Sequence, residues 1–239
     1  MIGEALSHEI DVFAAGVRSQ NPLFVQAEAG SLSLATVARY IANVHQLIRH
    51  TPYHLGKARD LSMARGDDAL ARHFAHKMVE EAGHDAWAAR DLEGLSRRGA
   101  PPPSDKVTPA MGALIRHIES LIDEDPALYL SYILFAEKLV VLMGPEWLAL
   151  LESRCGIPKS LLTIIGNHAE LDKDHVSEAL DEIDALVGDP KKLPAMRDAL
   201  RRSMDRFAAF CSELASSELA SMPSESDADR ESAKQIAAA

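Results

Sequence analysis

The chain has 239 residues and a formal net charge of −11 at pH 7. This length suits one domain with one sizeable core, and the negative charge argues against nucleic acid or an anionic membrane as a partner. The two cysteines, Cys155 and Cys211, form no disulfide framework, so we expect a cytoplasmic protein. We find no signal peptide at the start and no run of eighteen apolar residues, so we expect no membrane span.

The spacing of apolar residues predicts helices throughout the first half of the chain, and therefore an all-α protein. One helix is predicted over 4–19, and residues 23–30 are expected to be a loop or a short turn. The serines at 31–33 offer an N-cap for a helix that runs to about residue 48. Pro52 predicts a kink or a fresh start before the pattern resumes to Met63, and a long helix follows over 67–96.

The second half of the chain is also predicted to be helical, beginning with an amphipathic helix over 106–123. Asp125 and Pro126 form a start signal for an almost wholly apolar helix over 127–143, which we expect to be central. Gly144 and Pro145 should break it. The remaining predictions are a short helix over 146–153, a long one over 159–187 and a last one over 191–219. We therefore expect one domain over 1–220 and a flexible tail over 221–239.

The most informative motif lies on the helix predicted over 159–187. Because each helical residue turns by about 100°, His168, Asp172 and His175 fall within about 60° of one another. Two imidazoles and a carboxylate among apolar neighbours would be costly to bury unless something satisfied them. A metal ion would do so, and these residues would form half of its site. A hydrogen-bonded polar seam is the alternative interpretation.

A second pair of candidate ligands lies at Glu81 and His84, which are three residues apart and therefore neighbours on one helix face. Glu-x-x-His is the helical ligand pair of ferritin-like di-iron proteins. Glu80, four residues before His84, is nearly as well placed, and spacing alone does not separate the two glutamates. We favour Glu81. The alternative is that these are solvated surface residues.

Glu137 is the third candidate element, because it lies in the middle of the apolar helix predicted over 127–143. A carboxylate there must be paired, protonated or bound to a cation. Lys138 is adjacent in sequence but points about 100° away, so it is not an obvious partner. A metal ion is the economical explanation, and an arginine from another helix is the alternative.

These three elements together would bind two divalent metal ions of the iron or manganese kind. Carboxylates and imidazoles suit such ions, and the lack of a cysteine among them disfavours a structural zinc site. A carboxylate-bridged site of this type typically binds dioxygen, which favours an oxidase or oxygenase. Four further residues are candidates for the pocket, although helix histidines and aromatic residues are more often ordinary surface or core residues: His50, Tyr53, His54 and Tyr132.

The motifs resemble a known family. The stretches 80–95 and 168–175, with a lone Glu137 between them, resemble the heme-oxygenase-like di-iron oxidases. These belong to a superfamily with TenA/THI-4 proteins, PqqC and the chlamydial death-domain-associated protein. The intervals of 53 residues from His84 to Glu137 and of 31 from Glu137 to His168 also suit that pattern. The resemblance covers about residues 5–215 and implies a heme-oxygenase-like (TenA/PqqC-like) seven-helix bundle, often found as a homodimer.

The resemblance also implies a site and an activity. It implies a non-heme di-iron oxidase or oxygenase that uses dioxygen on a small aliphatic or amine substrate, with two iron ions, one of them labile. Manganese is the other metal that the site suits. Several members have a ligating Glu seven residues before the His, where this chain has Lys77, and others use the Glu three before it. The implied metal ligands are Glu81, His84, Glu137, His168, Asp172 and His175.

Two other functions remain open from the sequence. One is a metal-independent TenA/PqqC-like enzyme that acts on a heterocycle. A TenA-type thiaminase needs a pocket cysteine, for which Cys155 in a predicted loop and Cys211 near the end of the last helix are poorly placed. The other is a non-catalytic helical protein that binds a small molecule.

Overall fold

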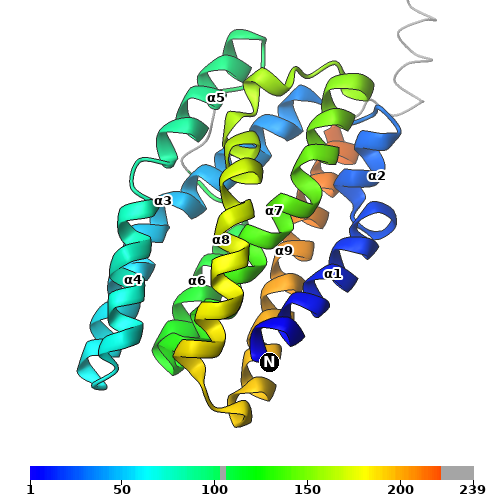
Figure 1. Ribbon diagram of the computed structural model, residues 1–239. Coiled ribbons are helices and arrows are strands. Elements are labelled where there is room, and N and C mark those ends of the chain that lie inside the picture. Colours follow the sequence, from blue (N-terminus) through cyan, green and yellow to red (C-terminus); the bar gives the residue numbers. More distant parts are fainter. Residues whose placement is uncertain (103–105, 222–239) are drawn as a thin grey trace, which may run out of the picture.

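The structure of the protein is a computed structural model that describes residues 1–102 and 106–221, so the predicted tail beyond residue 221 lies outside the described residues (Figure 1). The all-α prediction is confirmed. The described residues form nine α-helices and two short 3₁₀ helices: α1 (Ile2–Gln20), α2 (Pro22–Glu28), α3 (Leu34–Ala64), α4 (Asp68–Glu80), α5 (Asp85–Arg97), α6 (Pro109–Glu124), α7 (Pro126–Cys155), η1 (Lys159–Leu161), α8 (Thr163–Val187), η2 (Pro190–Lys192) and α9 (Leu193–Ser221).

Side-chain caps begin several of these helices as the sequence predicts. The Ser33 hydroxyl accepts a hydrogen bond from the Thr36 amide at 3.1 Å, and α3 begins directly after it. The loop or turn predicted over 23–30 is wrong. Asn21 ends α1 and at the same time caps α2, because its side chain accepts from the Leu23 amide at 3.0 Å. Pro22 in the first turn then favours a second, short helix.

Three predicted helix boundaries differ from the structure. α3 continues through Pro52, so no fresh helix starts there, and α7 continues through Gly144 and Pro145 to Cys155. A proline removes one intrahelical hydrogen bond, but buried residues beyond each proline, such as Leu55 and Trp147, keep the helix packed. Conversely, the single helix predicted over 67–96 is two helices, α4 and α5. A turn over 81–84 divides them, and Gly83 adopts a left-handed φ of 87° there.

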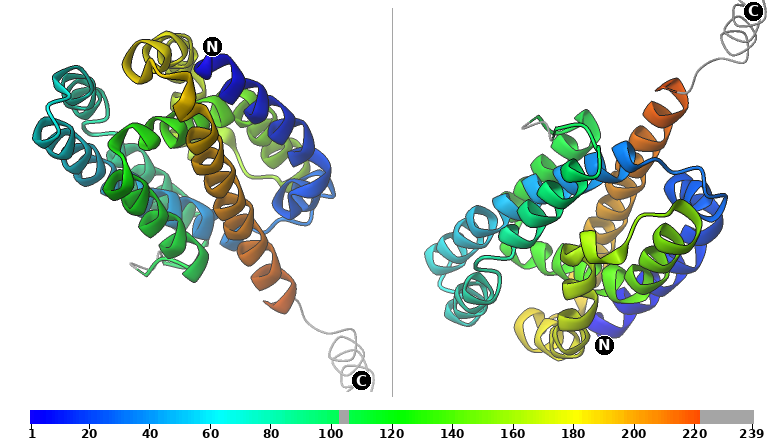
Figure 2. Two further views of the ribbon diagram at one scale, coloured as in Figure 1. Left: turned by 90° about the horizontal axis from the view of Figure 1, so that it is seen from below. Right: turned by 90° about the horizontal axis from the view of Figure 1, so that it is seen from above.

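α7 is the central helix, as its apolar sequence predicts. It packs most extensively against α8 and also contacts α1, α2, α3, α6 and α9 (Figure 1). α4 and α5 pack against α3, α5 also contacts α8, and α9 runs diagonally along the bundle (Figure 2). By length and composition α7 would be able to cross a membrane, but 67% of the qualifying window is buried inside the protein. α7 is therefore the core helix of the bundle.

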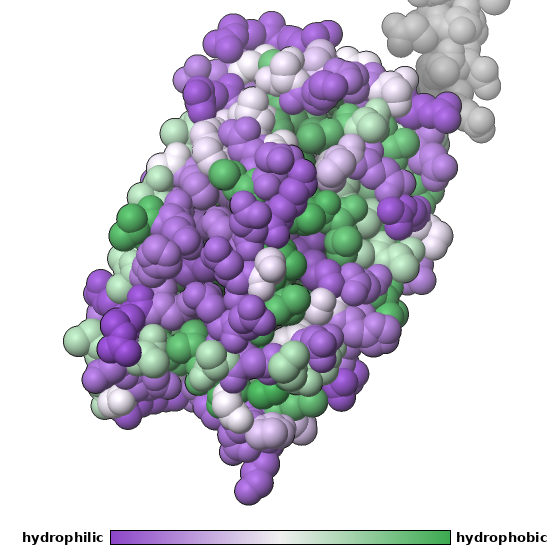
Figure 3. Space-filling model, viewed as in Figure 1, coloured by the Kyte–Doolittle hydropathy of each residue, from purple (hydrophilic) through white to green (hydrophobic). Residues whose placement is uncertain are grey.

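The start of α1 is attached to the C-terminal half of α8 beside α7. The Ile2 and Gly3 amides lie 2.6 and 3.4 Å from Asp184 Oδ1, so an α8 carboxylate caps the start of α1. Gly3 permits this approach, because a Cβ there would lie 2.7 Å from the Leu180 carbonyl oxygen. On the face of the molecule that Figure 3 shows, the surface is mostly hydrophilic, with smaller groups of hydrophobic side chains between the polar ones. The apolar faces turn inward around a cavity.

Candidate metal centre

A cavity of about 260 Å³ lies inside the bundle, walled mainly by α3, α7 and α8. Its lining includes Glu137 and Trp147, which are ten residues apart on α7 and therefore about 15 Å apart along the axis. Polar side chains line the cavity near Glu137, and aromatic side chains line it near Trp147. We call these the polar end (Lys77, Glu81, Glu137, His168 and Asp172) and the apolar end (Phe24, Tyr40, Trp147 and Cys211).

Three of the predicted ligands meet at the polar end. Ligand atoms of Glu81, His84 and His168 all lie within 4.8 Å of one another. Glu81 and His84 stand at the two ends of the turn between α4 and α5, with His84 Nδ1 3.2 Å from Glu81 Oε2. The sequence predicted that the pair would lie on one helix face. In the structure the two residues meet across a turn instead. α8 supplies His168, whose ring lies perpendicular to that of His84 with centroids 5.0 Å apart.

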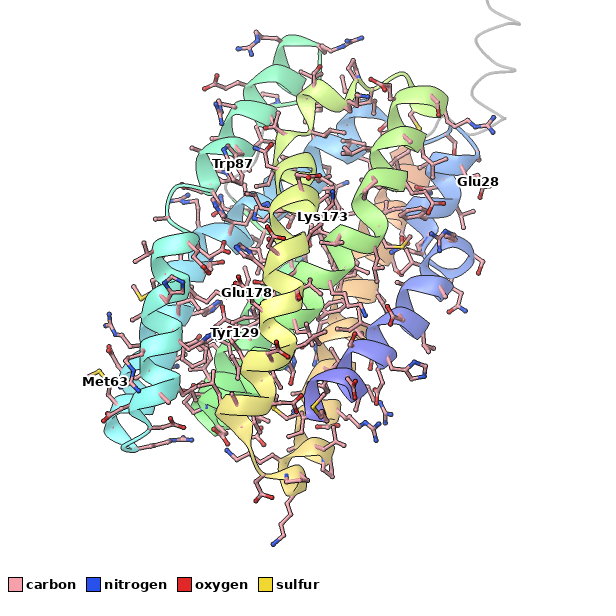
Figure 4. The ribbon with its side chains drawn as sticks, viewed as in Figure 1. Glu28, Met63, Trp87, Tyr129, Lys173 and Glu178 are labelled. Atoms are coloured by element: carbon pink, nitrogen blue, oxygen red, sulfur yellow. The ribbon has the colours of Figure 1, made fainter. Side chains whose placement is uncertain are left out.

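Neighbouring groups fix the orientation of the two imidazoles. Trp87, on the first turn of α5, stacks on His84 at 4.3 Å and meets His168 edge-on at 5.5 Å, on the side of α5 toward α8 (Figure 4). His168 Nδ1 lies 2.8 Å from the Ile164 carbonyl oxygen. A carbonyl only accepts, so Nδ1 carries the proton and Nε2 keeps its lone pair for a cation.

Glu137 is paired with a lysine. Lys77 Nζ, from α4, lies 3.0 Å from Glu137 Oε1 and 3.1 Å from Glu80 Oε2. Lys77 is only 4% exposed. The alternative of an ion pair for Glu137 is therefore found, with a lysine in place of the expected arginine. Glu80 also lies 3.1 Å from His76 Nε2, so it faces Lys77 and His76, and Glu81 is the glutamate that joins His84.

The two other α8 residues differ in position. Asp172 is 2% exposed and lines the cavity, one turn from His168. His175 lies a further turn along α8 and is not among the described residues that line the cavity. Its Nδ1 is hydrogen-bonded to Asp172 Oδ1 at 3.1 Å. His175 thus contacts Asp172 outside the cavity lining. The structure does not bring it to the group formed by Glu81, His84 and His168.

Burial and neighbouring negative charges make ionisation of the carboxyl groups at the polar end unfavourable. Burial, followed by the charges of Glu137 and Glu81, raises the pKa of Asp172 to about 8. Burial raises the pKa of Glu137 to about 7, although Lys77 opposes that shift. One oxygen of Glu137, Oε2, is buried without a hydrogen-bond partner among the described residues. Buried acids with raised pKa values and an unpaired oxygen mark a place where a cation would be favourable.

The ligand atoms of the three-residue group are in the form that binds metal. Burial lowers the pKa of His168, which keeps its imidazole neutral. Burial works to raise the pKa of Glu81, but the hydrogen bond with His84 and the charge of Lys77 hold it below its usual value. Metal ions bind neutral imidazole and ionised carboxylate. The group therefore fits a divalent transition metal of the iron or manganese kind.

Only part of the predicted pocket lines the cavity. Tyr132 does, whereas His50, Tyr53 and His54 lie outside its lining. α3 turns a different face to the cavity, made by Val44, Leu47, Ile48, Thr51 and Leu55. Tyr53 is 54% exposed and donates to Glu119 on the outside. His54 is buried, but its ring packs edge-on against Tyr129, which lies between α4 and α8 in Figure 4.

Several features of the site could not be predicted from the sequence or differ from the prediction. The ion pair of Lys77 with Glu137 spans 60 positions, so spacing gives no signal for it. Trp87 lies three residues after His84, and that interval is a signal for stacking. Cys155 ends α7 and does not lie in a loop. Cys211, judged poorly placed, lines the apolar end, where burial raises the pKa of its thiol to about 12.

Comparison with known proteins identifies the fold. No family model matches the sequence, and neither does any curated protein. A domain of unknown function with a heme oxygenase-like fold from Shewanella denitrificans superposes with a TM-score of 0.77 at 17% identity, covering 88% of this chain and 90% of that one. The heme-oxygenase-like fold implied by the motifs is therefore confirmed. The described residues form nine α-helices, against the seven that the resemblance implies.

Two further structures belong to the same fold. A CADD-like protein of unknown function from Nostoc punctiforme superposes with a TM-score of 0.69 at 18% identity, covering 90% of this chain and 99% of that one. A TenA homolog from Pseudomonas syringae gives a TM-score of 0.62 at 18% identity, covering 88% and 92%. At these identities the likeness establishes the fold, and the chemistry must be argued from the site.

Proposed function

We propose that this heme-oxygenase-like protein is an iron-dependent oxidase or oxygenase that uses dioxygen to oxidise a small aliphatic or amine substrate. The observation that carries the proposal is the meeting of Glu81, His84 and His168 at the polar end of a largely apolar cavity. Two imidazoles and a carboxylate are the donor set of many non-heme iron sites. Manganese suits the same donors.

The surroundings of the three residues support a bound cation. Glu137 and Asp172 line the same end of the cavity, and burial raises the pKa of both carboxyl groups. A divalent ion would lower the cost of burying these acids, because it compensates their charge. Its position beside the cavity leaves coordination room for a substrate or for dioxygen.

An iron ion, when bound, supplies dioxygen activation and changes of oxidation state. The chain supplies the setting. Trp87 and the Ile164 carbonyl orient the two imidazoles, and Tyr132 shapes the cavity wall beside Glu81. The apolar walls exclude water from the reacting groups. A cavity of about 260 Å³ holds a compact molecule with an apolar body, which agrees with a small aliphatic or amine substrate.

The metal-independent alternative is less well supported. Cys211 lines the cavity and would be the thiol available for covalent chemistry. Its pKa is raised to about 12 by burial, so the group stays protonated at neutral pH. A thiol is a weak nucleophile compared with a thiolate. The homodimer expected from the resemblance stays a prediction, since the structure describes a single chain.

The proposal is tested with protein that is loaded with ferrous iron under anaerobic conditions and then exposed to oxygen. We expect a ferrous-iron-dependent optical change and oxygen uptake, both measured by stopped flow and an oxygen electrode. His168→Ala should abolish both signals. His8→Ala, an exposed histidine on α1, should leave them unchanged. Oxygen uptake that is equal in the two variants, or absent from the wild-type chain, would reject the proposal.

A further inference from the structure

The buried ammonium of Lys77 stands where the resemblance places part of a second metal site. We infer that Lys77 is a built-in cation that replaces a second metal ion, so that each chain binds one divalent ion at Glu81, His84 and His168. This inference rests on the proposed function, because it presupposes a metal at that group. It departs from the two iron ions implied by the motifs, and the reason lies in the contacts of Lys77.

Lys77 occupies the carboxylates that a second ion would need. Its Nζ lies 3.0 Å from Glu137 Oε1 and 3.1 Å from Glu80 Oε2, and the side chain is almost fully buried. An ammonium has three donors and no lone pair, so it cannot serve as a ligand. A divalent ion placed on the same carboxylate oxygens would also be repelled by the ammonium at short range. A second ion would therefore have to displace Lys77 from a buried position.

His175, the other nitrogen ligand implied for a second ion, is not among the described residues that line the cavity. Its Nδ1 lies 3.1 Å from Asp172 Oδ1. Ligand atoms of Glu137, Asp172 and His175 do not form a group within 4.8 Å among the residues that the structure describes. In contrast, Glu81, His84 and His168 already stand together. Geometry thus favours one of the two positions.

Charge is consistent with a single ion. Four buried or half-buried acids surround the polar end: Glu80, Glu81, Glu137 and Asp172. Lys77 compensates one of these charges and a single divalent ion compensates two more, which leaves one negative charge. A second divalent ion would turn this into an excess of one positive charge, and it would have to lie close to the Lys77 ammonium.

Lys77 also leaves Glu137 able to reach the single ion. Lys77 holds Oε1, whereas Oε2 is buried and has no hydrogen-bond partner within the described part of the chain. Glu137 lines the same cavity as Glu81 and His168. We therefore assign Oε2 of Glu137 as a fourth ligand atom for the ion, beside one oxygen of Glu81 and the two imidazole nitrogens. Lys77 positions it through the other oxygen of the same carboxylate.

The inference is tested by counting manganese ions. The full chain is equilibrated with Mn²⁺ and separated from free metal, and the bound metal is measured by mass spectrometry. Electron paramagnetic resonance then distinguishes isolated Mn²⁺ from an exchange-coupled pair. We expect one ion per wild-type chain and an uncoupled spectrum. Lys77→Glu, which exchanges the ammonium for a ligand, should bind a second ion and give a coupled spectrum.

Lys191→Glu is the control, since it makes the same change of charge at an exposed position on η2. It should bind one ion. Circular dichroism checks that Lys77→Glu is folded. If the variant does not fold, the number of ions bound by the wild-type chain still tests the inference. Two ions per wild-type chain would overturn the inference and leave the proposed function standing. No bound ion in the wild-type chain would overturn both.

Discussion

The two tryptophans of the chain mark two ends of one cavity that are built in different ways. Trp87 packs on His84 and His168 at the polar end. Trp147 lines the apolar end, where its ring lies 5.1 Å from that of Phe24 and 6.3 Å from that of Tyr40. The apolar end is satisfied by ring packing alone. The polar end holds buried acids that the chain compensates incompletely.

The difference indicates at which end a bound cation would have the larger effect. Burial of apolar and aromatic surface stabilises the protein without any added group. Burial of several acids around one lysine costs stability, and proteins retain such arrangements mainly at functional sites. A cation should therefore change the stability and spectroscopy of the polar end strongly, and those of the apolar end little. The following predictions test that contrast, from the largest expected effect to the smallest.

Removal of a ligand should affect the polar end most. His84→Ala should weaken Mn²⁺ binding by at least about 100-fold, since even loss of an outer-shell partner of a metal ligand costs about 10- to 100-fold in affinity. Calorimetric titration measures the change. His8→Ala, exposed on α1, should retain the wild-type affinity. Equal affinities for the two variants would remove the polar end as the metal site and break the contrast.

Asp172→Asn should make the metal-free chain more stable at high pH. The pKa of Asp172 is raised from 3.8 to about 8 in the folded chain, so the folded state keeps a proton that the unfolded state loses. The free energy of unfolding therefore falls as the pH rises from about 4 to about 8, because the folded state resists losing this proton. Asparagine does not ionise, so the variant does not lose this part of the free energy of unfolding. We expect a gain of about 2 kcal/mol at pH 8 and a smaller gain at pH 5.

Urea unfolding with a chelator present measures these free energies at both pH values. Asp174→Asn is the matched control, because Asp174 is exposed two residues along the same helix. It should change stability little at either pH. With Mn²⁺ present, the order should reverse, since the wild-type carboxylate favours the bound ion. A gain that is independent of pH would show that Asp172 carries no electrostatic cost.

The apolar end should respond to shape and not to metal. Cys211 lines the apolar end, whereas Cys155, at the end of α7, lies outside the lining. Cys211→Leu should weaken the binding of a hydrophobic fluorescent dye about tenfold, which corresponds to about 1.4 kcal/mol. Cys155→Leu should not weaken it. Mn²⁺ affinity should be the same in both variants. A fall in metal affinity for Cys211→Leu alone would show that the two ends are coupled.

The fold was largely predictable because most of it depends on local sequence. Caps at Ser33 and Asp125 and the apolar run after Pro126 place the starts of α3 and α7 correctly. The errors at Pro52 and Pro145 have one cause. Tertiary packing on both sides of a proline outweighs the single hydrogen bond that it removes, and a sequence window contains no information about that packing.

The candidate site was predictable in its residue types and less so in its geometry. The histidine and acid spacings on α8 and near residue 81 pointed to the region where Glu81, His84 and His168 meet. The partners of those residues depend on contacts between distant helices, as in the Lys77–Glu137 pair of α4 and α7. Helical periodicity also concealed the turn at 81–84. The one local sign of this turn was Gly83, whose left-handed φ only the structure reveals.

That turn allows the last test of the contrast, through two glycines with the same backbone conformation. Gly83 has a φ of 87° and Gly66, between α3 and α4, has a φ of 77°. No heavy atom of the described residues would lie within 4 Å of a Cβ at either position. Alanine should therefore cost about 1 kcal/mol of stability in each variant, from backbone strain alone. Because only Gly83 lies between Glu81 and His84, Gly83→Ala alone should also weaken Mn²⁺ binding severalfold. Equal metal affinities in the two variants, beside equal losses of stability in urea, would show that the turn does not set the distance between these two ligands.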